Sequence, residues 1–352
     1  ITVLGGTAFT TLPQEMLQYM NADYGIAGEG IQSFPRLVRG IECGKVDTSI
    51  PGLVWRENNI INENTPFING YSEDLRPDWG AICIDKYRNS YLTPAATVVT
   101  KTGCPYQCSY CDTKTTMGDR FIINNPKAIA SNIGDMVKQY GTKNFFFIDP
   151  CFNTPLDWAK EVLYEVIRLK PAIRFMAVVN PIHNSYDGEF FELYKRAGGF
   201  FAMVGFESFS QSMLNHYRKP FNIDDIVNFD KLANQYQLKY GTELLFGGPG
   251  ENNETVKESM AFLPNIKFSL LIYGIGVRIL PQTEIFDIAK REGIIKDTNE
   301  LLFPKFYISK DLDQPWAENY IQKRVNQYSF RFLQMVPIEF KNKMGKLFNL
   351  KY

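Results

Sequence analysis

Short β-rich runs alternate with helical patterns from about residue 95 to residue 295, and this alternation restricts the possible fold more than any other feature. The expected strands are residues 96–100, 144–148, 174–179, 200–206, 242–246 and 271–279. The expected helices are residues 126–140, 155–170, 187–197, 223–237, 252–262 and 283–292. Six such units imply parallel strands joined by right-handed crossovers.

The predicted fold class is therefore α/β, in the form of an open three-quarter (β/α)6 TIM-like barrel. A doubly wound open sheet is the alternative architecture. In both folds the reactive groups gather at the C-terminal ends of the parallel strands. The residues that directly follow each expected strand are therefore the first candidates for a site.

The segments around the barrel have a different character. Residues 1–50 resemble the last part of a Rossmann-like α/β domain whose beginning is expected upstream of Ile1. Residues 51–94 are rich in Pro, Asn and Asp and predict an irregular linker. The barrel itself is assigned to residues 95–295, and residues 296–352 predict a helical C-terminal segment.

The charge balance excludes several classes of protein. Lys plus Arg equals Asp plus Glu, 38 of each, so no general attraction to nucleic acid or to an anionic membrane is expected. No run approaches eighteen consecutive apolar residues, and no signal-peptide pattern opens the chain. We expect a cytoplasmic protein without a membrane span, and the 14% of aromatic residues favours an apolar substrate cavity.

Three of the six cysteines, Cys104, Cys108 and Cys111, fall within eight residues directly after the first expected barrel strand. A disulfide framework suits short secreted chains better than a chain of this size. Structural zinc would need a fourth ligand, and the two histidines, His183 and His216, are far away in the sequence. An electron-transfer ferredoxin would need a fourth cysteine. Three thiolates on three irons of a [4Fe–4S] cluster leave the fourth iron with an open coordination position, which indicates a catalytic site and not a structural one.

The pattern Cys-x-x-x-Cys-x-aromatic-Cys resembles the signature of the radical S-adenosylmethionine (SAM) superfamily, and the likeness extends over residues 93–293. The resemblance implies a [4Fe–4S] cluster on Cys104, Cys108 and Cys111 with SAM chelated to the open iron. It also implies that Tyr110 contacts the adenine of SAM through its backbone.

Later strand ends carry further residues that the resemblance assigns to SAM. Those residues are Asp149, Asn180, Glu207, Ser208, Gly247, Gly248, Pro249 and Arg278. The alternative for Ser208 is a helix cap, and the alternative for the glycines is an ordinary turn. The sequence assigns no catalytic side chain beyond these binding residues.

The N-terminal fragment resembles the tail of the cobalamin-binding domain that precedes many such barrels. The resemblance implies that Gly5 and Gly6 lie beside the corrin or its nucleotide tail, while the alternative is a simple strand-to-helix turn. No Asp-x-His-x-x-Gly motif provides a lower-ligand histidine for cobalt.

The first functional hypothesis is a cobalamin-type radical SAM enzyme that modifies an unactivated carbon by methylation, rearrangement or cyclisation. Its partners would be a small or apolar substrate and a one-electron reductant such as a flavodoxin or ferredoxin. A cobalamin-independent member with a vestigial N-terminal domain is the second hypothesis. A non-catalytic iron–sulfur redox or binding protein is the third.

Overall fold

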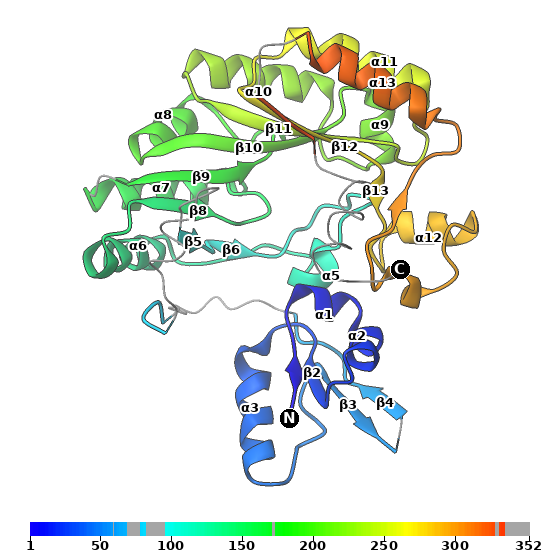
Figure 1. The fold of residues 1–352 in the computed structure, drawn as a ribbon. Helices are drawn as coiled ribbons and strands as arrows, with labels where there is room; N and C mark the ends of the chain where they lie inside the picture. Colours follow the sequence, from blue (N-terminus) through cyan, green and yellow to red (C-terminus); the bar gives the residue numbers. More distant parts are fainter. Residues whose placement is uncertain (59, 69–77, 82–95, 171–172, 328–330, 335–352) are drawn as a thin grey trace. The chain divides into compact units, whose positions relative to one another are not determined.

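The computed structural model describes residues 1–58, 60–68, 78–81, 96–170, 173–327 and 331–334, the last four without their side chains (Figure 1). It divides into two compact units, and each is treated by itself below. The smaller unit contains residues 1–72, 102–122 and 278–306. The larger unit contains residues 73–101, 123–277 and 307–352. Most of the expected linker after residue 68, with Cys83, and residues 335–352 lie outside the described residues.

A seven-stranded parallel sheet forms the centre of the larger unit. In spatial order its strands are β15 (Arg331–Gln334), β12 (Leu270–Ile275), β11 (Tyr240–Phe246), β10 (Gly199–Glu207), β9 (Arg174–Val179), β8 (Asn144–Phe147) and β5 (Ala96–Val98). From β5 to β12 the strands follow one another in chain order, as in a TIM-like barrel, whereas a doubly wound sheet reverses its order at a switch point. The α/β class and the six expected strands are confirmed.

Helices cover one face of this sheet (Figure 1). They are α6 (Pro126–Tyr140), α7 (Leu156–Arg168), α8 (Gly188–Arg196), α9 (Gln211–His216), α10 (Ile223–Gln235), α11 (Asn253–Phe262) and α13 (Gln314–Val325), with the 3-10 turn η1 (Leu263–Asn265) after α11. Side-chain oxygens fix several of the starts: Asn125, Asp187, Asn222 and Asn252 accept hydrogen bonds from backbone N–H groups of the first helical turn.

The strands have two unlike faces. In β8, Phe145 and Phe147 are buried in the core against the helices, whereas Phe146 between them is half-buried on the opposite face. The same alternation continues in the neighbouring strands because successive side chains of a strand point to opposite sides. We call the face away from the helices the inner face. Its half-buried positions include Phe146, Met176, Val178, Phe201, Met203, Gly205, Glu243, Leu245, Leu270 and Ile272.

The C-terminal segment departs from the expected all-helical structure. The 3-10 turn η2 (Thr298–Leu301), the short strand β14 (Phe306–Tyr307) and α13 precede β15, which pairs in parallel with β12. The helical prediction is therefore wrong for residues 331–334. Without β15, β12 would leave its backbone hydrogen-bonding groups unpaired at the sheet edge. The expected strand 271–279 is also interrupted, because Gly276 has φ 99° between β12 and β13 (Val277–Arg278).

The N-terminal part of the smaller unit is a four-stranded mixed sheet in the order β1-β2-β3-β4. Its elements are β1 (Val3–Leu4), α1 (Thr7–Thr11), α2 (Pro13–Tyr19), β2 (Tyr24–Ile26), α3 (Gly30–Glu42), β3 (Leu53–Glu57) and β4 (Ile60–Glu63). Only β1 and β2 run parallel, while β3 and β4 are antiparallel additions. A Rossmann-like domain is therefore not confirmed.

The hairpin β3–β4 also corrects the expected boundary at residue 51, since the start of the expected linker is part of this sheet. Leu53 and Val54 are fully buried in the small cores of the unit, which explains why the strand forms there. The smaller unit also contains α5 (Thr113–Met117) and α12 (Glu284–Arg291), with η2 between α12 and β14. The short strands β6 (Lys101–Thr102) and β7 (Ile122–Ile123) pair with each other. Among the described residues of both units, no helix is long and apolar enough to cross a membrane.

Candidate functional site

The cysteine loop, residues 103–121, is closed by contacts between its two ends. Gly103 has φ 75°, and a Cβ there would collide with the carbonyl of Arg120, so only glycine fits this position. The backbone N–H of Cys104 donates to the Gly118 carbonyl at 3.0 Å, and the rings of Tyr106 and Phe121 meet edge to face at 6.0 Å. Contacts within the protein therefore determine the conformation of the loop without a bound ligand.

The three thiols lie along this loop at different depths. Cys104 and Cys108 are half-buried, and Cys111 is exposed with its Sγ 3.0 Å from the Thr113 hydroxyl. The Cys111 N–H donates to the Cys108 carbonyl at 3.2 Å, which makes a turn between these two ligand positions. In the described part of the chain no three Cys, His, Asp or Glu side chains converge as on a single ion. A cubane cluster does not require such convergence, because each thiolate binds a different iron. Three thiols on one loop fit a [4Fe–4S] cluster by their chemistry.

Arg278 lies with the cysteine loop and Tyr110 in the smaller unit, whereas the other expected SAM residues lie in the larger unit. Its positive charge acts on Asp112, directly after Cys111. Partial burial raises the pKa of Asp112, and Arg278 opposes that shift. At the N-terminus of α12, the Ile285 N–H donates to the carbonyl of buried Ser109 at 3.1 Å, which anchors the middle of the loop.

The glycine pair at the N-terminus leaves open space. Gly6 precedes α1 with φ 89°, and a Cβ built on it would meet no atom within 4 Å. A Cβ on Gly5 would meet only the Ile26 carbonyl oxygen at 3.7 Å, an ordinary contact. The positive φ of Gly6 supports the strand-to-helix turn, and both glycines are exposed with open space beside them.

In the larger unit, Asp149 is fully engaged by the protein. Its carboxylate accepts hydrogen bonds from the N–H groups of Thr100 at 2.8 Å and Lys101 at 3.0 Å, and from the Thr100 hydroxyl. Burial raises its pKa against the effect of these donors. Asp149 thus fixes the end of the segment that leads, three residues later, into Cys104. Its expected contact with SAM stays a prediction.

Asn180 is held in a buried polar network after β9. Its N–H donates to Asn153 Oδ1 at 2.9 Å, and its carbonyl accepts from Asn153 Nδ2 at 2.8 Å. Its side chain hydrogen-bonds the buried Cys151 thiol, whose pKa is raised, chiefly by burial. The network gives Asn180 a structural role whether or not it also contacts a ligand.

Glu207 and Ser208 at the end of β10 both have protein partners. Glu207 adopts φ 66°, a strained conformation for a residue with a side chain, and its Oε1 lies 3.5 Å from Nζ of the buried Lys219. The Ser208 hydroxyl lies 3.1 Å from that of Ser259 and accepts the Ser210 N–H at 3.1 Å. Ser208 therefore holds the backbone of Ser210 just before α9, but it does not cap the helix, because Ser210 is the N-cap residue and no side chain caps this helix.

The loop after β11 is packed against aromatic side chains of the protein itself. A Cβ on Gly248 would collide with the ring of buried Tyr217, and one on Gly250 would collide with the His216 imidazole. Glu251 is buried and accepts the Gly247 N–H at 2.8 Å and the Thr255 hydroxyl at 3.2 Å. Glycine is needed at both positions because side-chain rings of the protein pack against them. Contact with an adenine is therefore not needed to explain these glycines.

Burial raises the pKa of Glu251 to about 7, even though the hydrogen bonds that it accepts act in the opposite direction. A carboxyl group in this position changes its charge near neutral pH. The loop that includes Pro249 is therefore hydrogen-bonded to a carboxyl group, Glu251, that titrates near neutral pH.

The structure sorts the expected site residues into two sets. The smaller unit holds Cys104, Cys108, Tyr110, Cys111, Arg278, Gly5 and Gly6, and the larger unit holds Asp149, Asn180, Glu207, Ser208, Gly247, Gly248 and Pro249. Glu243 and Lys219, which lie near Glu207, were not predicted as site residues. A charged residue inside the apolar run of β11 was the available signal for Glu243, because burying an unpaired charge is costly.

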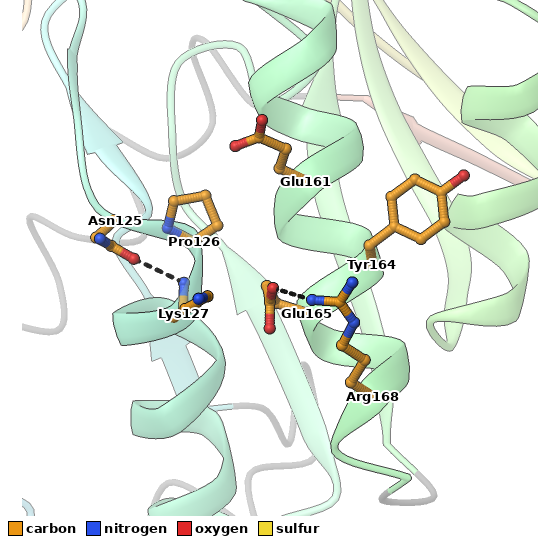
Figure 2. Close-up of a pocket in the computed structure, with 7 residues that line it drawn as sticks. All are labelled: Asn125, Pro126, Lys127, Glu161, Tyr164, Glu165 and Arg168. Atoms are coloured by element: carbon orange, nitrogen blue, oxygen red, sulfur yellow. Dashed lines mark hydrogen bonds and ion pairs between the residues drawn. The ribbon is translucent and has the colours of Figure 1, made fainter.

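A surface cavity of about 490 Å³ lies elsewhere, between the start of α6 and the outer side of α7 (Figure 2). It is lined by Asn125, Pro126, Lys127, Glu161, Tyr164, Glu165 and Arg168. Asn125 and Lys127 are joined by the helix-cap hydrogen bond, and Arg168 pairs with Glu165 on the same helix. None of the expected site residues lines this cavity.

Comparison with protein families gives a match between residues 98–263 and the radical SAM superfamily. An uncharacterised methyltransferase of Pyrococcus horikoshii is 23% identical over 300 residues, which cover 84% of this chain and 64% of the relative. The tryptophan 2-C-methyltransferase of Streptomyces laurentii is 21% identical over 341 residues, covering 79% of this chain and 56% of the relative.

Among solved structures, the radical S-adenosylmethionine methyltransferase TsrM of Kitasatospora setae, with cobalamin and a [4Fe–4S] cluster bound, has a TM-score of 0.70. It is 22% identical, and the match covers 82% of this chain and 57% of TsrM. At this identity the likeness shows a common fold. The chain spans between about half and two thirds of the length of these relatives.

Proposed function

This chain is a member of the radical SAM superfamily, and we propose that it holds a [4Fe–4S] cluster on Cys104, Cys108 and Cys111 and cleaves SAM reductively there. The cysteine loop carries the proposal, because its backbone contacts hold three thiols on one closed turn inside the matched residues. When bound, the cluster supplies the electron that converts SAM to methionine and a 5′-deoxyadenosyl radical. A flavodoxin or ferredoxin is the proposed reductant.

The protein's own residues contribute positioning and charge. Asp149 fixes the backbone of Thr100 and Lys101 just before the loop, and the Ser109 carbonyl ties the loop to α12. Arg278 and Asp112 place opposite charges beside the last cysteine. A preorganised loop of this kind keeps the ligand positions in place with little reorganisation when a ligand binds.

We further propose that the reaction is a cobalamin-dependent methylation of an unactivated carbon. Two relatives are named as methyltransferases, and TsrM was solved with cobalamin. In this chain, the space beside Gly5 and Gly6 supports a corrin contact. The positive φ of Gly6, which a strand-to-helix turn explains by itself, favours the second candidate, a cobalamin-independent enzyme of the same superfamily.

The test is turnover of SAM by the anaerobically purified protein in the presence of dithionite. We expect 5′-deoxyadenosine from the wild type and from a Cys43→Ser control, and none from a Cys108→Ser variant. Release of S-adenosylhomocysteine without 5′-deoxyadenosine would contradict reductive cleavage. Retention of a corrin spectrum after reconstitution with hydroxocobalamin distinguishes the two candidates.

A further inference from the structure

Glu243 is a charged side chain in the middle of an apolar surface. It lies on the inner face of β11, opposite Ile272 of β12. One step earlier on the same face, a Cβ on Gly241 would lie 3.0–3.2 Å from atoms of Phe201, Met203 and Leu270. The surroundings of Glu243 along the sheet are therefore mainly hydrocarbon, sulfur and aromatic carbon.

The charged side chains of Glu207 and Lys219 also lie near Glu243. A Cβ on Gly205 would lie 2.8 Å from Glu207 Oε1, so the strained Glu207 directs its carboxylate back over the inner face. Lys219 pairs with Glu207 at 3.5 Å. Glu243 interacts electrostatically with both residues, unfavourably with Glu207 and favourably with Lys219. Two carboxylates and one ammonium leave one negative charge in excess.

The Glu243 carboxylate has no hydrogen-bond donor within the part of the chain that the structure describes. Burial, followed by the Glu207 charge, raises its pKa. A half-buried carboxylate without a hydrogen-bond donor is unfavourable, and a hydrogen bond from a cation removes much of that cost. A ligand with a positive charge on an apolar body would satisfy both the carboxylate and the surface around it.

We propose that the inner face of the larger unit binds an apolar substrate that carries a protonated amine, and that the Glu243 carboxylate accepts the ammonium group. This inference rests on the proposed function, since it names the substrate class of the same enzyme. Lys219 disfavours a divalent metal ion at the same position, because its ammonium would repel the ion. A single organic cation needs only the one excess negative charge.

The experiment measures binding of 4-phenylbutylamine and 4-phenylbutanol to the purified protein by calorimetry at pH 7.5. The two probes share an apolar body and differ in the ammonium group. Wild type should bind the amine about tenfold more tightly, as expected for one charge-assisted hydrogen bond. In Glu243→Gln this preference should disappear while the alcohol binds as before, and Glu243→Asp should retain part of it.

Equal affinity of wild type for both probes, or an unchanged preference in Glu243→Gln, would overturn the proposal. Loss of SAM affinity in Glu243→Gln at unchanged amine binding would also overturn it, because Glu243 would then serve the cofactor. The melting temperature of each variant reports whether it folds. If SAM turnover fails while the amine preference is found, the proposed reaction is wrong and the binding site stands.

Discussion

The cysteine loop after β5 and the glycine loop after β11 both follow strands of the same parallel sheet. They differ in how far contacts within the protein account for their residue types. In the glycine loop, protein partners fill the available space: Tyr217 packs on Gly248, and Glu251 accepts the Gly247 N–H. In the cysteine loop, backbone hydrogen bonds and Gly103 set the shape, while the thiol of Cys111 is exposed.

The difference teaches that a motif at a strand end is not by itself a ligand site. The glycine loop is explained by packing within the chain, so a bound ligand is not needed to account for its residue types. The cysteine loop holds three thiols in a shape that packing alone does not require. We therefore expect variants of the first loop to change stability and variants of the second to change cofactor content.

The largest expected effect concerns the cysteine loop. Replacing Cys104, Cys108 and Cys111 together by Ala should remove all iron and acid-labile sulfide from the purified protein, because each thiolate binds one iron. Chemical iron and sulfide analysis and the visible spectrum check this result. Cys43→Ala, at an exposed position at the end of α3, is the control and should keep full iron content. A triple variant with unchanged iron would contradict the assignment.

In the glycine loop, Glu251 should make stability depend on pH. Its pKa rises from 4.5 to about 7 in the folded protein, so the folded state binds more protons between these values. The free energy of unfolding should therefore fall as pH rises from 4.5 to 7, by roughly 3 kcal/mol at about 1.4 kcal/mol per pH unit.

Glu251→Gln should lose this contribution, which melting curves at pH 5 and pH 7.5 measure. Glu254→Gln serves as the control because Glu254 is an exposed residue on the same helix start. The same pH dependence in wild type and Glu251→Gln would show that Glu251 does not titrate in this range.

A somewhat smaller loss of stability is expected for Gly248→Ala. The new methyl group would meet the buried Tyr217 ring, and overpacking of this kind costs about 1–3 kcal/mol. Gly134→Ala in α6 is the matched control, because its Cβ would make an ordinary 3.5 Å contact with Leu169. Denaturant unfolding measures both. An unchanged stability together with weaker SAM binding would return Gly248 to a ligand role.

The smallest effect on stability is expected at Gly5. Its Cβ would fit beside Ile26, so Gly5→Ala should change the free energy of unfolding by no more than about 0.5 kcal/mol. If a corrin lies there, the same variant should lose corrin absorbance that wild type retains after desalting. Gly6→Ala is a poorer test, because its φ of 89° strains any side chain. Full retention by Gly5→Ala would remove the glycine pair from the cobalamin proposal.

Local patterns predicted the regular elements of the barrel well. The expected helix 126–140 and the expected strand 174–179 have the same bounds in the structure. Both are determined by side-chain periodicity and by signals next in sequence, such as the Asn125 cap before Pro126. The spacing of the cysteines is also a local feature, because one short loop carries all three and its surroundings do not change that spacing.

Strand additions at sheet edges were not predicted. The strands β3, β4 and β15 form because an edge of a sheet has unpaired backbone groups, and the pairing partner is distant in the sequence. No short-range periodicity of residues 51–63 or 331–334 contains that information.

The sequence by itself determined the order of strands and helices, the cysteine loop and the superfamily signature, because each depends on residues within one or two turns of each other. Only the tertiary structure decided that Tyr217 packs on Gly248, that Lys219 pairs with Glu207, and that Glu243 stands on an apolar face. These contacts depend on strand register and on burial, and both arise when segments distant in the sequence pack together.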